Sequence, residues 1–105
     1  MQDANLPSAD LLKTVLEPLL EDFEYWFGRS HQLLENETMP FMSDQEQSQL
    51  LGRIKQAELE LNAVKMLFNA SDCQVGIDMA TLAPWHQLVT ECWKVGMRFH
   101  QTQAQ

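Results

Sequence analysis

The sequence predicts an all-α fold, in which a long antiparallel helical hairpin packs with a shorter third helix as a three-helix bundle. Large apolar residues recur at alternating spacings of four and three along two long segments, which is the period of a helix and not of a strand. A short break with helix-stopping and capping residues separates these segments, and a third amphipathic segment follows. At 105 residues the chain is expected to be one domain over 1–105, with disordered tails at 1–7 and 102–105.

The first helix is expected over 8–37, with Ser8 as its N-cap. Pro18 lies inside this segment and removes one helical hydrogen bond. The apolar pattern passes through the proline without a phase break, so we predict one kinked helix and not two helices. The residues that carry the pattern are Leu12, Leu16, Leu19, Phe23, Trp26 and Leu33, with Leu20, Phe27 and Leu34 widening the apolar face.

The second helix is expected over 44–69, after a break at 38–43 that contains Pro40. Ser43 and Glu46 form a capping-box pattern, in which each side chain bonds the backbone amide of the other residue. Two long helices joined by so short a break are expected to fold back as an antiparallel hairpin. Its apolar positions are Leu50, Ile54, Ala57, Leu61, Val64 and Phe68.

The third helix is expected to start after Thr81, a candidate N-cap, with Pro84 in its first turn, and to run to about Gln101. Its apolar arc is expected to pack on the hairpin, and Gly96 in that arc allows another backbone to come close. Trp93 lies on the flank of the arc. The arc itself consists of Trp85, Leu88, Val89, Cys92, Val95, Gly96 and Phe99.

The composition disfavours several classes of partner. A net charge of -8 repels phosphate backbones and anionic lipids, so nucleic-acid binding is not expected. No apolar run approaches the ~20 residues of a membrane span, and the N-terminal residues lack the pattern of a secretory signal. We therefore expect a cytoplasmic protein without membrane insertion, in which Cys73 and Cys92 are reduced thiols.

A partner-binding surface is expected where the third helix fails to cover the hairpin. A helix of about 18 residues covers roughly 27 Å, whereas each hairpin helix spans about 40 Å. Uncovered apolar area of this kind marks interaction sites. The apolar residues of the break either dock a partner or fold onto the hairpin end as a plug. The candidate partner-binding residues are Phe27, Met39, Phe41, Met42, Leu67, Trp85 and Trp93.

The sequence contains no recognisable catalytic or cofactor motif. The Glu-x-x-His pairs of a diiron helical bundle are missing, because no glutamate stands three residues before any histidine. Neither a glycine-rich phosphate loop nor a nucleophile elbow occurs, and Cys92 falls on the buried arc, where thiols are usually inert. We expect no enzyme and no cofactor. The alternative is a metal- or small-ligand-binding bundle that uses His31, Glu35, His86 and His100.

Three stretches, "LLKTVLEPLLEDFEYWF", "GRIKQAELELNAVKMLF" and "QVGIDMATLAPWHQLVTECW", resemble a small cyanobacterial protein family of unknown function, DUF2605. The resemblance implies a protein of a photosynthetic bacterium, but it implies no activity and no site residues. From the apolar surface of the hairpin and the region of Trp85 and Trp93, we expect a non-enzymatic interaction module, an adaptor, assembly factor or regulator, that binds a protein partner or itself as a homodimer.

Overall fold

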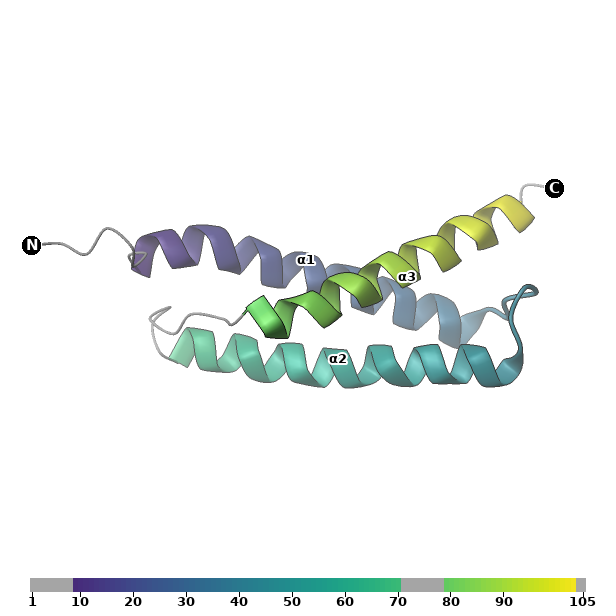
Figure 1. Cartoon of the computed structure of the whole chain (residues 1–105), viewed down its shortest axis with the longest axis horizontal. Coiled ribbons are helices and arrows are strands. Elements are labelled where there is room, and N and C mark those ends of the chain that lie inside the picture. Colours follow the sequence, from purple (N-terminus) through teal and green to yellow (C-terminus); the bar gives the residue numbers. More distant parts are fainter. Residues whose placement is uncertain (1–8, 71–78, 104–105) are drawn as a thin grey trace, which may run out of the picture.

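The computed structural model consists of three helices, α1 (Ala9–Asn36), α2 (Asp44–Ala70) and α3 (Met79–Gln103) (Figure 1). It describes residues 9–70 and 79–103, and the side chains of 14–70 and 80–103. α1 and α2 form the antiparallel hairpin, and α3 packs mainly on α1. The described residues contain no strand. The predicted all-α three-helix bundle is therefore confirmed.

The capping box at the start of α2 is present as predicted. The Ser43 amide donates to Glu46 Oε1 at 2.9 Å, and the Glu46 amide donates to Ser43 Oγ at 3.0 Å. Hydrogen bonding from Ser43 lowers the pKa of the Glu46 carboxyl, because the charged form accepts these bonds. These contacts satisfy two backbone donors and fix the point at which α2 begins.

A glutamine joins the two ends of the hairpin turn. The Gln47 side-chain oxygen accepts a hydrogen bond from the Met39 amide at 2.9 Å. Its Nε2 group donates to the carbonyl oxygens of Leu34 and Glu37 at 2.8 and 2.7 Å. Carbonyl groups at the end of a helix lack partners within the helix, so Gln47 of α2 supplies the C-terminal end of α1 with donors.

The ends of α3 differ from the prediction. The helix begins at Met79 and ends at Gln103, so Thr81 lies inside it and is not the N-cap. At the other end the Thr102 hydroxyl donates to the Arg98 carbonyl at 2.9 Å, within the last turn of the helix. Residues 102 and 103 were expected to belong to a disordered tail, and they are helical instead. The rest of the expected tails, residues 1–7 and 104–105, and the expected N-cap Ser8 lie outside the described residues. With 25 residues, α3 is about 37 Å long. The expected difference in length between the third helix and the hairpin helices was therefore too large.

The core lies along the line where the three helices meet. The most buried residues of α1 are not those of the predicted main row alone. Leu20, Phe27 and Leu34 of the widening row are buried, whereas Leu19 and Leu33 of the main row are only half-buried. α1 has to face α2 and α3 together, so its buried arc is centred between the two predicted rows. α1 remains one helix through Pro18, as predicted. The buried apolar residues are Leu16, Leu20, Phe23, Phe27, Leu34, Met39, Leu50, Ile54, Ala57, Leu61, Phe68, Leu82, Trp85, Leu88, Val89, Cys92 and Phe99.

Ion pairs between helices set the register of the bundle. Lys65 of α2 lies 2.7 Å from Glu24 of α1, and Arg53 of α2 donates two hydrogen bonds, at 3.0 and 2.6 Å, to the Glu91 carboxylate of α3. Exposed pairs contribute only about 0–1 kcal/mol each. Their role is to select one alignment of the helices over shifted ones.

Candidate functional site: an apolar groove between α1 and α3

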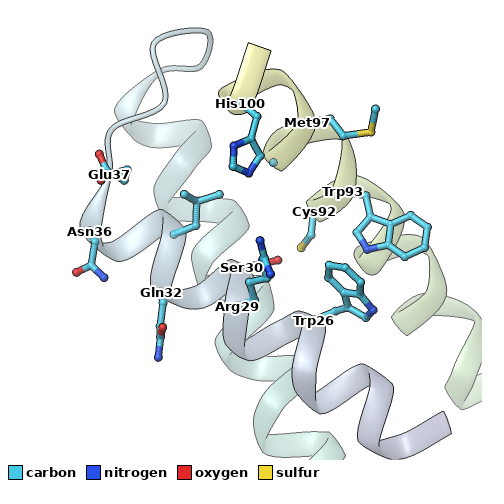
Figure 2. A pocket seen from close by; sticks show the side chains of 12 residues that line it. Trp26, Arg29, Ser30, Gln32, Asn36, Glu37, Cys92, Trp93, Met97 and His100 are labelled. Carbon is cyan, nitrogen blue, oxygen red and sulfur yellow. The ribbon is translucent and has the colours of Figure 1, made fainter. Parts of the chain in front are cut away.

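A groove lies between the C-terminal halves of α1 and α3. α3 crosses α1 near its middle and then diverges from it toward the C-terminus (Figure 1). The space between the two helices has a volume of about 590 Å³. We call it the α1–α3 groove; α1 contributes Trp26, Arg29 and Leu33 to its walls, and α3 contributes Trp93, Gly96 and Met97 (Figure 2).

Aromatic rings hold one end of the groove. The Trp26 and Trp93 rings meet edge to face, with centroids 5.3 Å apart, and Tyr25 packs against Trp26 in the same way at 5.1 Å. Edge-to-face contacts of this kind stabilise by about 0.5–1.5 kcal/mol beyond simple burial. Trp93 remains 48% exposed. The groove therefore has one pre-ordered aromatic end with apolar surface still open to a partner.

The α3 wall of the groove is open at Gly96. A Cβ atom built on Gly96 would meet no heavy atom within 4 Å. The predicted role of Gly96 in packing the hairpin is therefore wrong, because none of the residues that the structure describes fills the space beside it. Met97 next to it is 64% exposed, and its flexible thioether side chain adapts to irregular surfaces. An incoming segment can approach the α3 backbone closely at this point.

The polar groups that line the groove include a thiol, a guanidinium and an imidazole. Burial raises the pKa of the Cys92 thiol, with the nearby Ser30 side chain acting in the opposite direction, so the thiol stays neutral near pH 7. The Arg29 guanidinium donates to Tyr25 Oη at 2.9 Å and pairs with no carboxylate in the described part of the chain. His100 lies toward the other end of the groove from the tryptophans (Figure 2).

The predicted partner-binding residues fall into three environments. Trp93 lines the groove, and Leu67 is 57% exposed but lies on α2, away from it. Phe41 and Met42 are half-buried against the core, and the Arg98 guanidinium lies 4.6 Å from the centre of the Phe41 ring. The apolar residues of the break at 38–43 were expected either to dock a partner or to fold onto the end of the hairpin, and the structure supports the second interpretation.

Three of the predicted partner-binding residues were wrong, because Phe27, Met39 and Trp85 are at most 3% exposed. Phe27 stacks on Phe23, with ring centroids 5.9 Å apart. Trp85 packs edge-on against the same phenylalanine, and its Nε1 group donates to Glu60 at 3.5 Å. Side chains buried in this way present little surface to a partner.

Sequence reasoning missed the residues that flank Trp93. Trp26 was assigned to the core seam, although it is half-buried and faces the groove. Tyr25 and Met97 are more than half exposed and were not selected as partner residues. The available signal was a second row of positions on α1 with the same four-three spacing as the core seam, which includes Tyr25 and Arg29.

Of the four candidate metal ligands of the alternative prediction, His31 and Glu35 lie together, whereas the other two lie elsewhere. His31 bridges two carboxylates, with Nδ1 2.6 Å from Glu58 Oε1 and Nε2 3.3 Å from Glu35 Oε1. His86 packs edge-on against Phe23 at 5.0 Å, whereas His100 lines the groove. Lys55 and then His31 lower the pKa of Glu35. Within residues 14–70 and 80–103, no group of three His, Cys, Asp or Glu side chains is arranged to hold a metal ion.

The fold and the groove define a small three-helix bundle protein with an open apolar groove along one side. The chain matches, over residues 6–101, the family described as a protein of unknown function (DUF2605), and it belongs to this family. Comparisons with curated proteins and with solved structures give no match. None of the described helices combines the length and the hydropathy that crossing a membrane requires.

Proposed function

We propose that this chain is a non-enzymatic protein-interaction module in the cytoplasm of a photosynthetic bacterium, and that it binds a helix of a protein partner in the α1–α3 groove. The observation that carries the proposal is the groove itself, where Trp93 and Met97 leave 48% and 64% of their surfaces exposed beside an open glycine. Large exposed apolar side chains gathered in a groove are typical of interaction sites.

A helix suits this groove better than an extended peptide does. The walls are two diverging helices, and a further helix between them would complete a four-helix arrangement with apolar contacts on both sides. Peptides that bind as strands need an exposed sheet edge, and the described residues form no sheet. Aromatic residues at the centre of an interface supply much of the binding free energy, and Trp26 and Trp93 occupy that position.

The second candidate function is binding of a small apolar ligand in the same groove. Its volume of about 590 Å³ lies within the range of roughly 300–1,000 Å³ that is common for ligand sites. The exposed fractions of Trp93 and Met97, 48% and 64%, favour a macromolecular partner over a small molecule that needs enclosure. We therefore place the small ligand second.

The test is photo-crosslinking in the native cell. A photoreactive residue at Met97, in the groove, is compared with one at Leu59, which is 68% exposed on α2. We expect a covalent protein adduct from position 97 and none from position 59. A small-molecule adduct from position 97 favours the second candidate, and the absence of any adduct there contradicts the proposal.

A matched pair of glycine variants shows whether the groove is responsible. Gly96→Leu fills the groove, whereas Gly52→Leu adds the same side chain to α2, and neither new Cβ meets a heavy atom within 4 Å. Both changes replace helical glycine, which removes a destabilising residue from the helix. The adduct from position 97 is expected to disappear with Gly96→Leu and to persist with Gly52→Leu.

A further inference from the structure

α1 carries a second row of residues with alternating three and four spacing, and every one of them is exposed. We call this row the outer seam of α1; it consists of Val15, Pro18, Asp22, Tyr25, Arg29, Gln32 and Asn36. Its C-terminal members, from Arg29 onward, line the α1–α3 groove. A seam of this spacing on a helix is the pattern by which two helices pack along each other. The core does not use it.

The two charged residues of the outer seam are complementary but cannot meet within one chain. Asp22 and Arg29 are seven residues apart, so they project from nearly the same side of α1 about 10 Å apart along its axis. Neither pairs with an opposite charge among the described residues. Other basic groups on α2 do have acidic partners, Arg53 with Glu91 and Lys55 with Glu35.

A second copy of α1, laid antiparallel, satisfies both charges together. The midpoint between Asp22 and Arg29 lies between Tyr25 and Trp26, the aromatic residues at the end of the groove. A two-fold axis through this midpoint places Asp22 of each copy opposite Arg29 of the other. The same rotation lays the 56% exposed Val15 of one copy over Asn36 of the other, inside the groove.

We propose that the α1–α3 groove binds the N-terminal half of α1 from a second copy of this chain, in a two-fold pair centred on Tyr25 and Trp26. The proposal rests on the proposed function, because it names the helix that the groove binds. It gives the open space beside Gly96 an occupant, and it brings a second helix against the exposed Trp93 and Met97 side chains. Each copy supplies one groove and one helix.

Charge reversal tests this pairing. Asp22→Arg places two arginines against each other at both symmetry-related contacts, and Arg29→Asp does the same with two aspartates. Each variant alone is expected to dissociate about 10- to 100-fold more readily than the native chain. An equimolar mixture of the two variants is expected to associate again, because each new arginine then faces a new aspartate and each native pair is kept. Sedimentation velocity over a concentration series measures all three samples.

The matched control is Glu21→Arg. Glu21 is the exposed neighbour of Asp22 but lies on another side of α1, beside Lys65 and Phe68 of α2. The same change of charge there is expected to leave self-association within about twofold of native. Circular dichroism of every variant verifies that the helical content is unchanged, so that loss of association is not loss of folding.

Several results would overturn the pairing. A native chain that stays monomeric at every concentration excludes a second copy as the occupant. Association that survives Asp22→Arg, or a mixture of the two variants that stays monomeric, excludes this arrangement of the two copies. None of these results contradicts the proposed function, which fails only if position 97 crosslinks to no protein; a monomeric chain that crosslinks there to another protein keeps the function and loses the pairing.

Discussion

Replacement of Gln47 is the sharpest test of how the hairpin is held together. This one side chain makes three hydrogen bonds of 2.7–2.9 Å, to the Met39 amide and to the carbonyls of Leu34 and Glu37. The donors and acceptors fix its orientation, because an amide N–H can bond only the amide oxygen and the two carbonyls can accept only from Nε2. Gln47→Ala removes all three bonds at once.

The expected loss follows from the surroundings of these bonds. A hydrogen bond in a folded protein contributes about 0.5–1.5 kcal/mol net, so three bonds give an upper range of about 1.5–4.5 kcal/mol. The bond to the Glu37 carbonyl is exposed and the other two are partly buried, so water replaces part of what is lost. We expect Gln47→Ala to lower the free energy of unfolding by about 2 kcal/mol. Gln47→Glu should cost more, because it turns a carboxylate oxygen toward two carbonyl oxygens.

Urea denaturation followed by circular dichroism at neutral pH measures these differences. Gln49→Ala is the control, since Gln49 is exposed two residues further along α2 and its loss should change stability by less than about 0.5 kcal/mol. If Gln47→Ala is as mild as Gln49→Ala, or if Gln47→Glu is no worse than Gln47→Ala, then this bridge does not hold the hairpin turn.

Three further outcomes are expected. Leu61→Ala should lower the free energy of unfolding by about 2–5 kcal/mol because Leu61 is 2% exposed, while Leu19→Ala should cost less because Leu19 is half-buried; equal losses in urea denaturation would contradict the observed packing. Hydrogen bonding from Arg53 holds the pKa of Glu91 below its ordinary value of 4.5, so the stability it adds is present above that value and is lost as the pH falls through the lowered pKa. Urea titrations between pH 7 and 3 should therefore show a smaller loss for Glu91→Gln than for the native chain, and identical losses would contradict this. Cys92 should react slowly with thiol reagents at pH 7, because the thiol is 5% exposed and its pKa is raised; rapid labelling of Cys92, identified by mass spectrometry, would show that α3 detaches from the core.

Local sequence rules predicted the helices because the determinants are local. The four-three spacing, the capping box at Ser43 and the short break around Pro40 each depend on residues close together in the chain, and the structure has α2 start at Asp44 as expected. The end of α3 was placed two residues too early, at about Gln101 and not at Gln103, because no glycine or proline in the last turn marks where the helix stops.

Burial was predicted less well, because it depends on how helices are placed around each other. Phe27 was among the hairpin residues expected to stay uncovered because α3 was too short, and it is buried. Gln47 was not selected either, although it joins α1, the break and α2. Its partners lie 8–13 residues away, so no spacing rule for a single helix identifies it.

The groove depends on the direction in which α3 leaves α1, and this direction is a property of the whole bundle. The sequence correctly placed Trp93 on the flank of the α3 arc, but it could not show that Trp26 would face it at 5.3 Å. Gly96 was expected to bring two backbones of the bundle together, and it instead leaves space open. Both outcomes follow from the divergence of the two helices.

The net charge of -8 opposes association of two copies, so the position of the acidic residues decides whether a pair can form. Glu24, Glu35 and Glu91 bind basic groups of other helices, and Glu21 lies toward α2. Along the outer seam, Asp22 and Arg29 cancel each other, and the remaining five members are uncharged. Repulsion between charges farther apart than about 8 Å is largely screened at physiological salt. Glu37 lies at the end of the groove (Figure 2). Elsewhere along the outer seam a second acidic chain meets little opposition, and it also finds the exposed tryptophan and methionine of the groove.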